Sequence, residues 1–138
     1  MSPSSGPSVG VFCAEPGEIL EVLRRELPDD IPILVCDRHD GIDEIIDDVD
    51  VLLAYKFGRE YPFPRDRILE APRLQWVQLG AAGADHIAPY AGSDVIVTRA
   101  SGIHGEIMAQ YVIATLVHRL WDFPRLLRQQ SEHVWEKY

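Results

Sequence analysis

The feature that most constrains the fold is a regular alternation of short apolar runs with stretches of helical periodicity. Residues 16–27 place apolar side chains at helical spacing, and shorter helices are expected near 41–48 and 65–71. Short apolar runs between these stretches predict five strands, at residues 8–13, 31–36, 51–55, 74–79 and 95–98. Strands that are apolar on both faces and separated by helices indicate a parallel sheet covered on both sides.

The expected fold class is α/β, with a doubly wound, flavodoxin-like, five-stranded parallel sheet. Right-handed crossovers favour the strand order 2-1-3-4-5. In such sheets ligands bind beyond the carboxyl ends of the strands. A binding site is therefore expected among the turns that follow Cys13, Cys36, Tyr55, Leu79 and Thr98.

The last part of the chain is predicted to be helical, without further strands. Two helices are expected, at residues 104–120 and 123–133, and the first has apolar groups around most of its circumference. A helix that is apolar on nearly all sides needs partners on nearly all sides. We therefore expect a flexible leader at 1–7, a sheet domain at 8–102 and a helical arm at 103–138. Exposed apolar helices also predict self-association through 104–133.

Composition narrows the classes of partner. The formal charge of −9 argues against a nucleic acid or an anionic membrane as partner, because both would repel this surface. The only lysines are Lys56 and Lys137, against eleven arginines. Abundant acidic residues with few lysines indicate either adaptation to high salt or a GC-rich genome, and the sequence does not separate the two.

Motifs that are present only in part, or absent, argue against several other kinds of site and cellular location. Cys13 and Cys36 stand in apolar strands, so we expect reduced, buried thiols and neither a disulfide nor a metal site. His104 and Glu106 form half of a zinc-deaminase signature, but no P-C-x-x-C follows. No G-x-S-x-G elbow of a serine hydrolase is present. Without a signal-peptide pattern or an apolar run of roughly 18 residues, the expected location is the cytoplasm.

The turn after the fourth expected strand is the strongest candidate for a ligand site. Residues 80–83, Gly-Ala-Ala-Gly, carry almost no side-chain bulk. Small residues let a ligand approach the backbone, and successive N–H groups can form a concavity that binds an anion. The alternative is a tight turn without a ligand. Asp85, just beyond, is expected to cap a short helix, and His86 to be structural or solvated.

Three segments together resemble the D-isomer-specific 2-hydroxyacid dehydrogenases, and most of all the glyoxylate and hydroxypyruvate reductases among them. They are LQWVQLGAAGADHI at 74–87, VTRASGIHGEIMAQ at 97–110 and QQSEHVWE at 129–136. The resemblance extends over essentially the whole chain. Gln110 departs from it, because relatives often have Glu there, which puts any charge pairing of that Glu in doubt.

The resemblance implies a substrate-binding site. It assigns the amides of Ala82 and Gly83, with Ala81 adjacent, to the substrate carboxylate. Lys56 and Phe57 would help to select the substrate side chain, although a solvated lysine is the commoner fate of such a residue. Ile103 would line the substrate and nicotinamide site.

The resemblance also implies what this stretch leaves out. Members of the family bind the cofactor pyrophosphate on a G-x-G-x-x-G turn, and this chain has none. Their catalytic Arg, Glu and His lie in a cofactor domain that would begin after about Tyr138. The chain is therefore expected to be a truncated piece with no catalytic, cofactor-binding or metal-binding residue, inactive alone.

The expected whole enzyme interconverts 2-keto acids and D-2-hydroxy acids with NAD or NADP, as a homodimer. The alternative is a stand-alone flavodoxin-fold module that binds small carboxylates. A phosphate-accepting receiver module is disfavoured, because the first and third strands do not end in clustered carboxylates.

Overall fold

A computed structural model describes residues 6–136 of the chain. Most of the expected leader, 1–7, and the last two residues of the expected arm lie outside the described residues. The chain divides into two compact units, Met1–Ser101 and Gly102–Tyr138.

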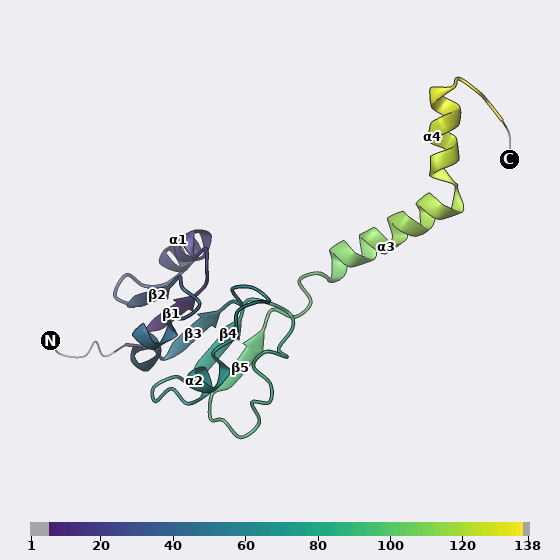
Figure 1. The fold of residues 1–138 in the computed structure, drawn as a ribbon. Coiled ribbons are helices and arrows are strands. Elements are labelled where there is room, and N and C mark those ends of the chain that lie inside the picture. Colours follow the sequence, from purple (N-terminus) through teal and green to yellow (C-terminus); the bar gives the residue numbers. More distant parts are fainter. Residues whose placement is uncertain (1–5, 137–138) are drawn as a thin grey trace. The chain divides into compact units, whose positions relative to one another are not determined.

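The first unit is built on a five-stranded, all-parallel sheet of order β2-β1-β3-β4-β5, which confirms the predicted order (Figure 1). Val9 pairs with both Ile33 and Val51, so the central strand β1 is held on both sides. Five short apolar runs form the strands: β1 (Val9–Phe12), β2 (Ile33–Cys36), β3 (Val51–Ala54), β4 (Trp76–Leu79) and β5 (Ile96–Arg99).

The main core lies on one face of this sheet. Because side chains alternate along a strand, the register places Phe12, Leu52 and Leu79 on that face together. All three are completely or almost completely buried. Three short elements supply the buried residues that pack against them: η1 (Ile42–Glu44), η2 (Ile46–Asp48) and α2 (Arg65–Leu69).

The helix expected near 41–48 is wrong: two 3₁₀ turns, η1 and η2, occupy this stretch. An α-helix would place Asp43 beside Asp47, and Glu44 beside Asp48, at the i,i+4 spacing where like charges destabilise it. In the observed fold Arg67 of α2 lies between the first pair instead. Its Nε is 2.5 Å from Asp43 Oδ1 and its Nη2 is 2.6 Å from Asp47 Oδ2.

The second face of the sheet is covered only in part. α1 (Gly17–Glu26) forms as predicted, and Ile19 and Leu23 line one hollow together with Leu53 of β3. Farther along the same face, Trp76 is 41% exposed and Ile96 is 63% exposed. The expectation of a sheet covered on both sides is therefore wrong for β4 and β5.

The connection from β4 to β5 contains a turn where a short helix capped by Asp85 was expected. The amides of Ile87 and Ala88 both donate to Ala84 O, at 3.2 and 3.1 Å, and the turn ends there. Pro89 explains the stop, because a proline disfavours helical backbone at the preceding residue. The side chain of Ile87 is fully buried and anchors this turn to the core.

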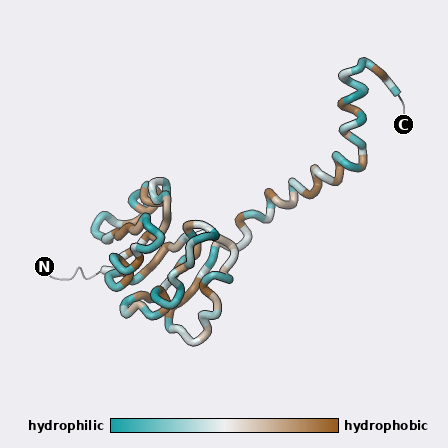
Figure 2. The backbone as a smooth tube through the Cα atoms, in the orientation of Figure 1, coloured by the Kyte–Doolittle hydropathy of each residue, from teal (hydrophilic) through white to brown (hydrophobic). Residues whose placement is uncertain are grey.

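The second unit consists of two helices, α3 (Gly105–Leu120) and α4 (Phe123–Ser131), close to the predicted ranges. They are separated at Asp122, whose φ of 46° lies in the left-handed region. Figure 2 shows hydrophobic residues recurring along α3. Neither helix contains a buried residue. Among the described residues, no helix has both the length and the apolar character needed to cross a membrane.

Candidate functional site

The candidate site lies at the carboxyl edge of the sheet, where three loops begin side by side. The amide of Tyr55 donates to Phe12 O at 2.8 Å, and that of Gly80 donates to Ala54 O at 3.0 Å. The amide of Ala100 donates to Leu79 O at 3.2 Å. These bonds extend the strand pairing by one residue and fix where the loops after β3, β4 and β5 start.

Gly80 is held under an aromatic ring. A Cβ atom added to this glycine would stand 2.0 Å from Cε1 of Tyr55, so no larger residue fits while the ring stays in place. On the other side of the turn, Ala81 O accepts a hydrogen bond from the Ala100 amide at 3.2 Å. The start of the 80–83 turn is thus fastened to both neighbouring loops.

The amides expected to bind a carboxylate are available. Within residues 6–136, the N–H groups of Ala81, Ala82 and Gly83 donate no hydrogen bond. Ala82 is half-buried, whereas Ala81 and Gly83 are exposed. A Cβ atom added to Gly83 would have Asp85 Oδ2 as its nearest neighbour, at 3.8 Å, so the space beside this backbone is open. Unpaired N–H groups in a turn can bind an anion.

Phe57 and Lys56 follow β3 at the same edge. Phe57 is half-buried, and its ring centroid lies 4.7 Å from that of Phe12. Lys56 is exposed and stands at the rim of a small hollow that Phe57 also lines. Within residues 6–136 its ammonium group forms no ion pair. Phe57 is therefore part of the wall, and Lys56 is a charge at its edge.

His86 belongs to this site, although the sequence did not single it out. It is half-buried, and its ring meets Phe63 edge-on with centroids 4.6 Å apart. Burial, and then the charge of Lys56, lower the pKa of His86, while Asp85 opposes this shift. Lys56 and His86 thus influence each other from separate loops, because β3 and β4 are neighbours in the sheet.

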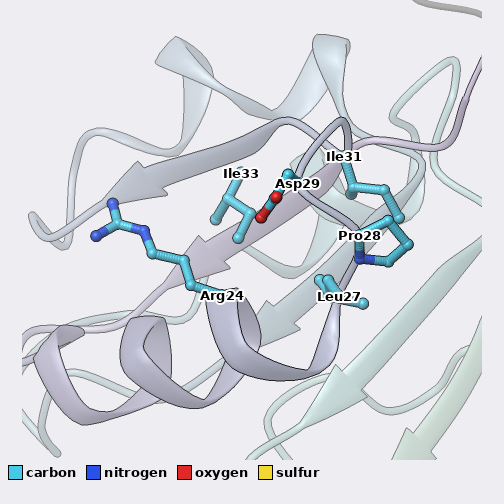
Figure 3. Close-up of a pocket in the computed structure, with 6 residues that line it drawn as sticks. All are labelled: Arg24, Leu27, Pro28, Asp29, Ile31 and Ile33. Carbon is cyan, nitrogen blue, oxygen red and sulfur yellow. The ribbon is translucent and has the colours of Figure 1, made fainter.

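Larger hollows lie elsewhere. One of about 350 Å³ is formed by Arg24 of α1, by residues 27–31 and by Ile33, the first residue of β2 (Figure 3). Since the strands are parallel, this is the opposite edge of the sheet from the 80–83 turn. Within the described part of the chain, no titratable group with a resolved pKa shift lines this hollow, and the hollow lies away from the edge where ligands of open parallel sheets bind.

The structure gives little support for a reactive thiol or a metal site. Cys13 and Cys36 are buried and unpaired, as predicted. Burial is the main cause that raises the pKa of the Cys36 thiol, and its Sγ lies 3.2 Å from Arg38 O. Within the described range, no group of three His, Cys, Asp or Glu side chains is placed to hold a metal ion.

Several solved dehydrogenase structures contain a part with a similar fold. A D-isomer specific 2-hydroxyacid dehydrogenase family protein from Aeromonas salmonicida is 22% identical, with a TM-score of 0.70, over 97% of this chain and 42% of that one. A probable 2-hydroxyacid dehydrogenase from Rhizobium etli, solved with NADP, HEPES and L(+)-tartaric acid, is 20% identical, with a TM-score of 0.62, over 96% and 40%.

A third structure agrees with these two. The NAD-dependent formate dehydrogenase from Staphylococcus aureus, solved with NAD, is 20% identical, with a TM-score of 0.57, over 94% of this chain and 43% of that one. The chain has the fold found in D-2-hydroxyacid dehydrogenases. It spans about two-fifths of the length of these solved dehydrogenases. No family model and no curated protein sequence matches it.

Two residues connect the resemblance to the second unit. Ile103 belongs to that unit and is 55% exposed, so its assignment to the dehydrogenase site stays a prediction. Gln110, where relatives often have Glu, donates from Nε2 to Glu106 Oε1 at 3.3 Å. Its amide is thus used within α3.

Proposed function

We propose that this chain is the substrate-binding part of an NAD(P)-dependent D-2-hydroxyacid dehydrogenase. One observation carries the proposal: the amides of Ala81, Ala82 and Gly83 are free at the carboxyl edge of a sheet with the dehydrogenase fold. Ligands of open parallel sheets bind at that edge. The substrate would be a 2-keto acid or the corresponding D-2-hydroxy acid.

The role of this chain in the reaction is to bind and orient. The N–H groups of Ala82 and Gly83 would hold the carboxylate, and Phe57 would close one side of the site. Fixing the carboxylate orients the adjacent keto carbon, which lowers the entropy that is lost at the transition state. A nicotinamide cofactor supplies or accepts the hydride in such a reaction.

The residues of this chain do not fit that cofactor. Its sequence has no G-x-G-x-x-G turn to bind the pyrophosphate. The catalytic Arg, Glu and His that the resemblance requires would also come from a cofactor domain. We therefore assign substrate binding alone to residues 6–136, and propose that NAD or NADP binds outside them.

A binding experiment on the chain itself tests the carboxylate site. In ¹⁵N-labelled protein titrated with pyruvate, the amide signals of Ala82 and Gly83 should shift together. The variant Gly83→Val should weaken binding about tenfold or more, because its side chain would stand beside the free N–H groups. The control Gly17→Val adds the same side chain in open space at the start of α1 and should leave binding unchanged. Shifts elsewhere that spare Ala82 and Gly83 would refute the site.

A second candidate is a stand-alone module that binds small carboxylates. It is favoured by the fact that the turn, Lys56, Phe57 and His86 all belong to the first unit. Turnover separates the two candidates. Joined to the cofactor domain of a dehydrogenase of this fold, the chain should reduce 2-keto acids with NADH or NADPH. A folded fusion that binds pyruvate and cofactor but transfers no hydride would favour the binding module.

The exposed apolar surface of α3 supports a further part of the proposal, a homodimer. Ile107, Tyr111 and Leu116 are each more than half exposed. Apolar side chains gathered on a helix without buried residues mark a surface that other protein covers. A second copy of this chain is the partner we propose.

A further inference from the structure

Lys56 is a rare residue type in this chain and lies at the sheet edge where a ligand is expected. It is one of only two lysines in a chain of net charge −9. Arg38, Arg65, Arg67 and Arg73 each lie within 4.0 Å of a carboxylate, whereas Arg59 and Arg99, at the carboxyl edge of the sheet, form no ion pair within residues 6–136. Lys56 has no such partner within residues 6–136, so its charge is available to a ligand at the carboxyl edge.

The surroundings of Lys56 strengthen its pull on an anion. Lys56 stands exposed beside the rings of Phe12, Phe57 and Phe63, and the space between these side chains is too small for a water molecule, so an anion would meet Lys56 on its outer side. Beside these walls the effective dielectric is lower than in water, so opposite charges attract more strongly. His39 and Tyr61 complete the outer side, with ring centroids 4.1 Å apart.

His86 approaches the same place from the neighbouring loop, through its contact with Phe63. Burial and then the charge of Lys56 lower the pKa of His86, and an anion bound beside the ring would raise it again. The other charged or titratable groups on or against these loops are Arg59, Glu60, Asp85, Asp94, His39 and Arg65, whose guanidinium donates to Ile87 O and Pro89 O. Asp85 alone among them affects the pKa of His86.

Gly83 and His86 are close along the chain, and Lys56 follows the neighbouring strand β3. His86 is three residues after Gly83, and three residues span at most roughly 11 Å. A substrate with two anionic groups would have to span this separation. The amides would take the carboxylate next to the keto carbon, and the cations would take the other group.

Building on the proposed function, we propose that Lys56 and His86 form a second anion subsite, which makes the preferred substrates 2-keto and D-2-hydroxy acids with a second carboxylate. Lys56 supplies the fixed charge. His86 donates a hydrogen bond and, when protonated, a second positive charge. Phe12, Phe57 and Phe63 exclude water from one side of the pair.

The test uses the 138-residue chain and two acids that differ by one carboxylate, D-lactate and D-malate, at constant ionic strength. Both should shift the amide signals of Ala82 and Gly83 in ¹⁵N spectra. D-malate should bind about tenfold more tightly. Lys56→Met should abolish this preference, because it should lower the affinity for D-malate more than the affinity for D-lactate. Arg59→Met, which removes a neighbouring exposed cation, should leave the preference intact and so controls for general charge.

The pH dependence tests His86 separately. The affinity for D-malate should rise as the pH falls from about 7.5 to about 5.5, because the anion favours protonated His86. In His86→Asn this rise should disappear. The amide shifts of Gly83 report in each case whether the turn is still formed.

The outcomes separate the two proposals. If both acids shift Ala82 and Gly83 but bind equally well, the second subsite is wrong and the carboxylate site stands. The second subsite is also wrong if Arg59→Met removes the preference as fully as Lys56→Met does. If neither acid shifts these amides, the proposed function fails, and the subsite fails with it.

Discussion

Both units of this chain contain regular secondary structure, but among the described residues only the sheet unit has a buried core. Every buried apolar side chain among residues 6–136 belongs to the sheet unit, whereas α3 and α4 bury none. An isolated helix of 16 residues is marginal in water, because tertiary packing supplies most of a helix's stability. The difference indicates that the sheet unit carries the stability of the chain, and the proposed second copy would supply the packing that the arm lacks.

A matched pair of leucines tests this comparison most strongly. Leu52 is fully buried in the core and Leu116 is 57% exposed on α3. Leu52→Ala should lower the free energy of unfolding by about 2–5 kcal/mol, since it removes contacts and leaves a cavity. Leu116→Ala should change it by less than about 0.5 kcal/mol. Urea titration followed by circular dichroism measures both, and equal losses would mean that the arm is packed as firmly as the sheet.

Two glycines of the candidate site offer the next test within the sheet unit. Gly80→Ala should lower the free energy of unfolding by about 1–3 kcal/mol, because the new methyl group overlaps the Tyr55 ring. Gly83→Ala should have an effect below about 0.5 kcal/mol, because its methyl group enters open space. The same urea titration serves here. A stable Gly80→Ala protein would show that the ring can move away from the turn.

Asp50 tests a polar part of the sheet unit. Its Oδ2 accepts hydrogen bonds from the Ser8 amide at 2.9 Å and the Ser8 hydroxyl at 2.8 Å, and Arg73 Nη2 lies 2.9 Å away. Asp50→Asn should lower the free energy of unfolding by about 1–3 kcal/mol.

The same carboxylate makes the stability of the fold depend on pH. The Ser8 amide first, and then the Ser8 hydroxyl and Arg73, lower the pKa of Asp50 in the folded protein. Its contribution to stability is therefore present above the ordinary pKa of 3.8 and is lost as the pH falls through the lowered value. Urea midpoints at about pH 7 and about pH 3 should differ less for Asp50→Asn than for the natural chain. An unchanged difference would assign the acid sensitivity to other carboxylates.

The smallest expected effect concerns the arm. If a second copy covers α3, sedimentation should show association that grows with concentration. Leu116→Asp should weaken it about tenfold, because a carboxylate would be buried in an apolar contact. Gln110→Asp places the same charge at a polar position of α3 and should have a smaller effect. A natural chain that sediments as a monomer at every concentration would remove the dimer from the proposal.

The sequence predicted the parts of the fold that depend on local pattern. Runs such as 51–55 and 74–79 are apolar over the length of one strand, and helical spacing within 16–27 identified α1. The stretch 41–48 was misjudged because its conformation depends on four carboxylates and on Arg67, which lies about twenty residues away. The helix predicted after β4 does not form, because Pro89 disfavours helical backbone at Ala88.

The candidate site also has parts that the sequence predicted and parts that it did not. The small residues at 80–83 stand out in the sequence, because a turn with so little side-chain bulk lets a ligand approach the backbone, and their role as a carboxylate site stays a prediction. The roles of Tyr55 and His86 could not, since each depends on a contact between the loops after β3 and β4. Ile103 remains a prediction, because it belongs to the other unit.

The ring of Tyr55 over Gly80 links two positions that would otherwise evolve independently. Residue 55 begins the loop that contacts one end of the proposed substrate, and residue 80 begins the turn that would hold the other end. A larger residue at 80 is tolerated only after 55 becomes smaller, so the order in which such mutations accumulate matters. Chimeras that exchange residues 51–58 alone between relatives would therefore separate a ring from its glycine, and should lose function more often than chimeras that exchange both segments.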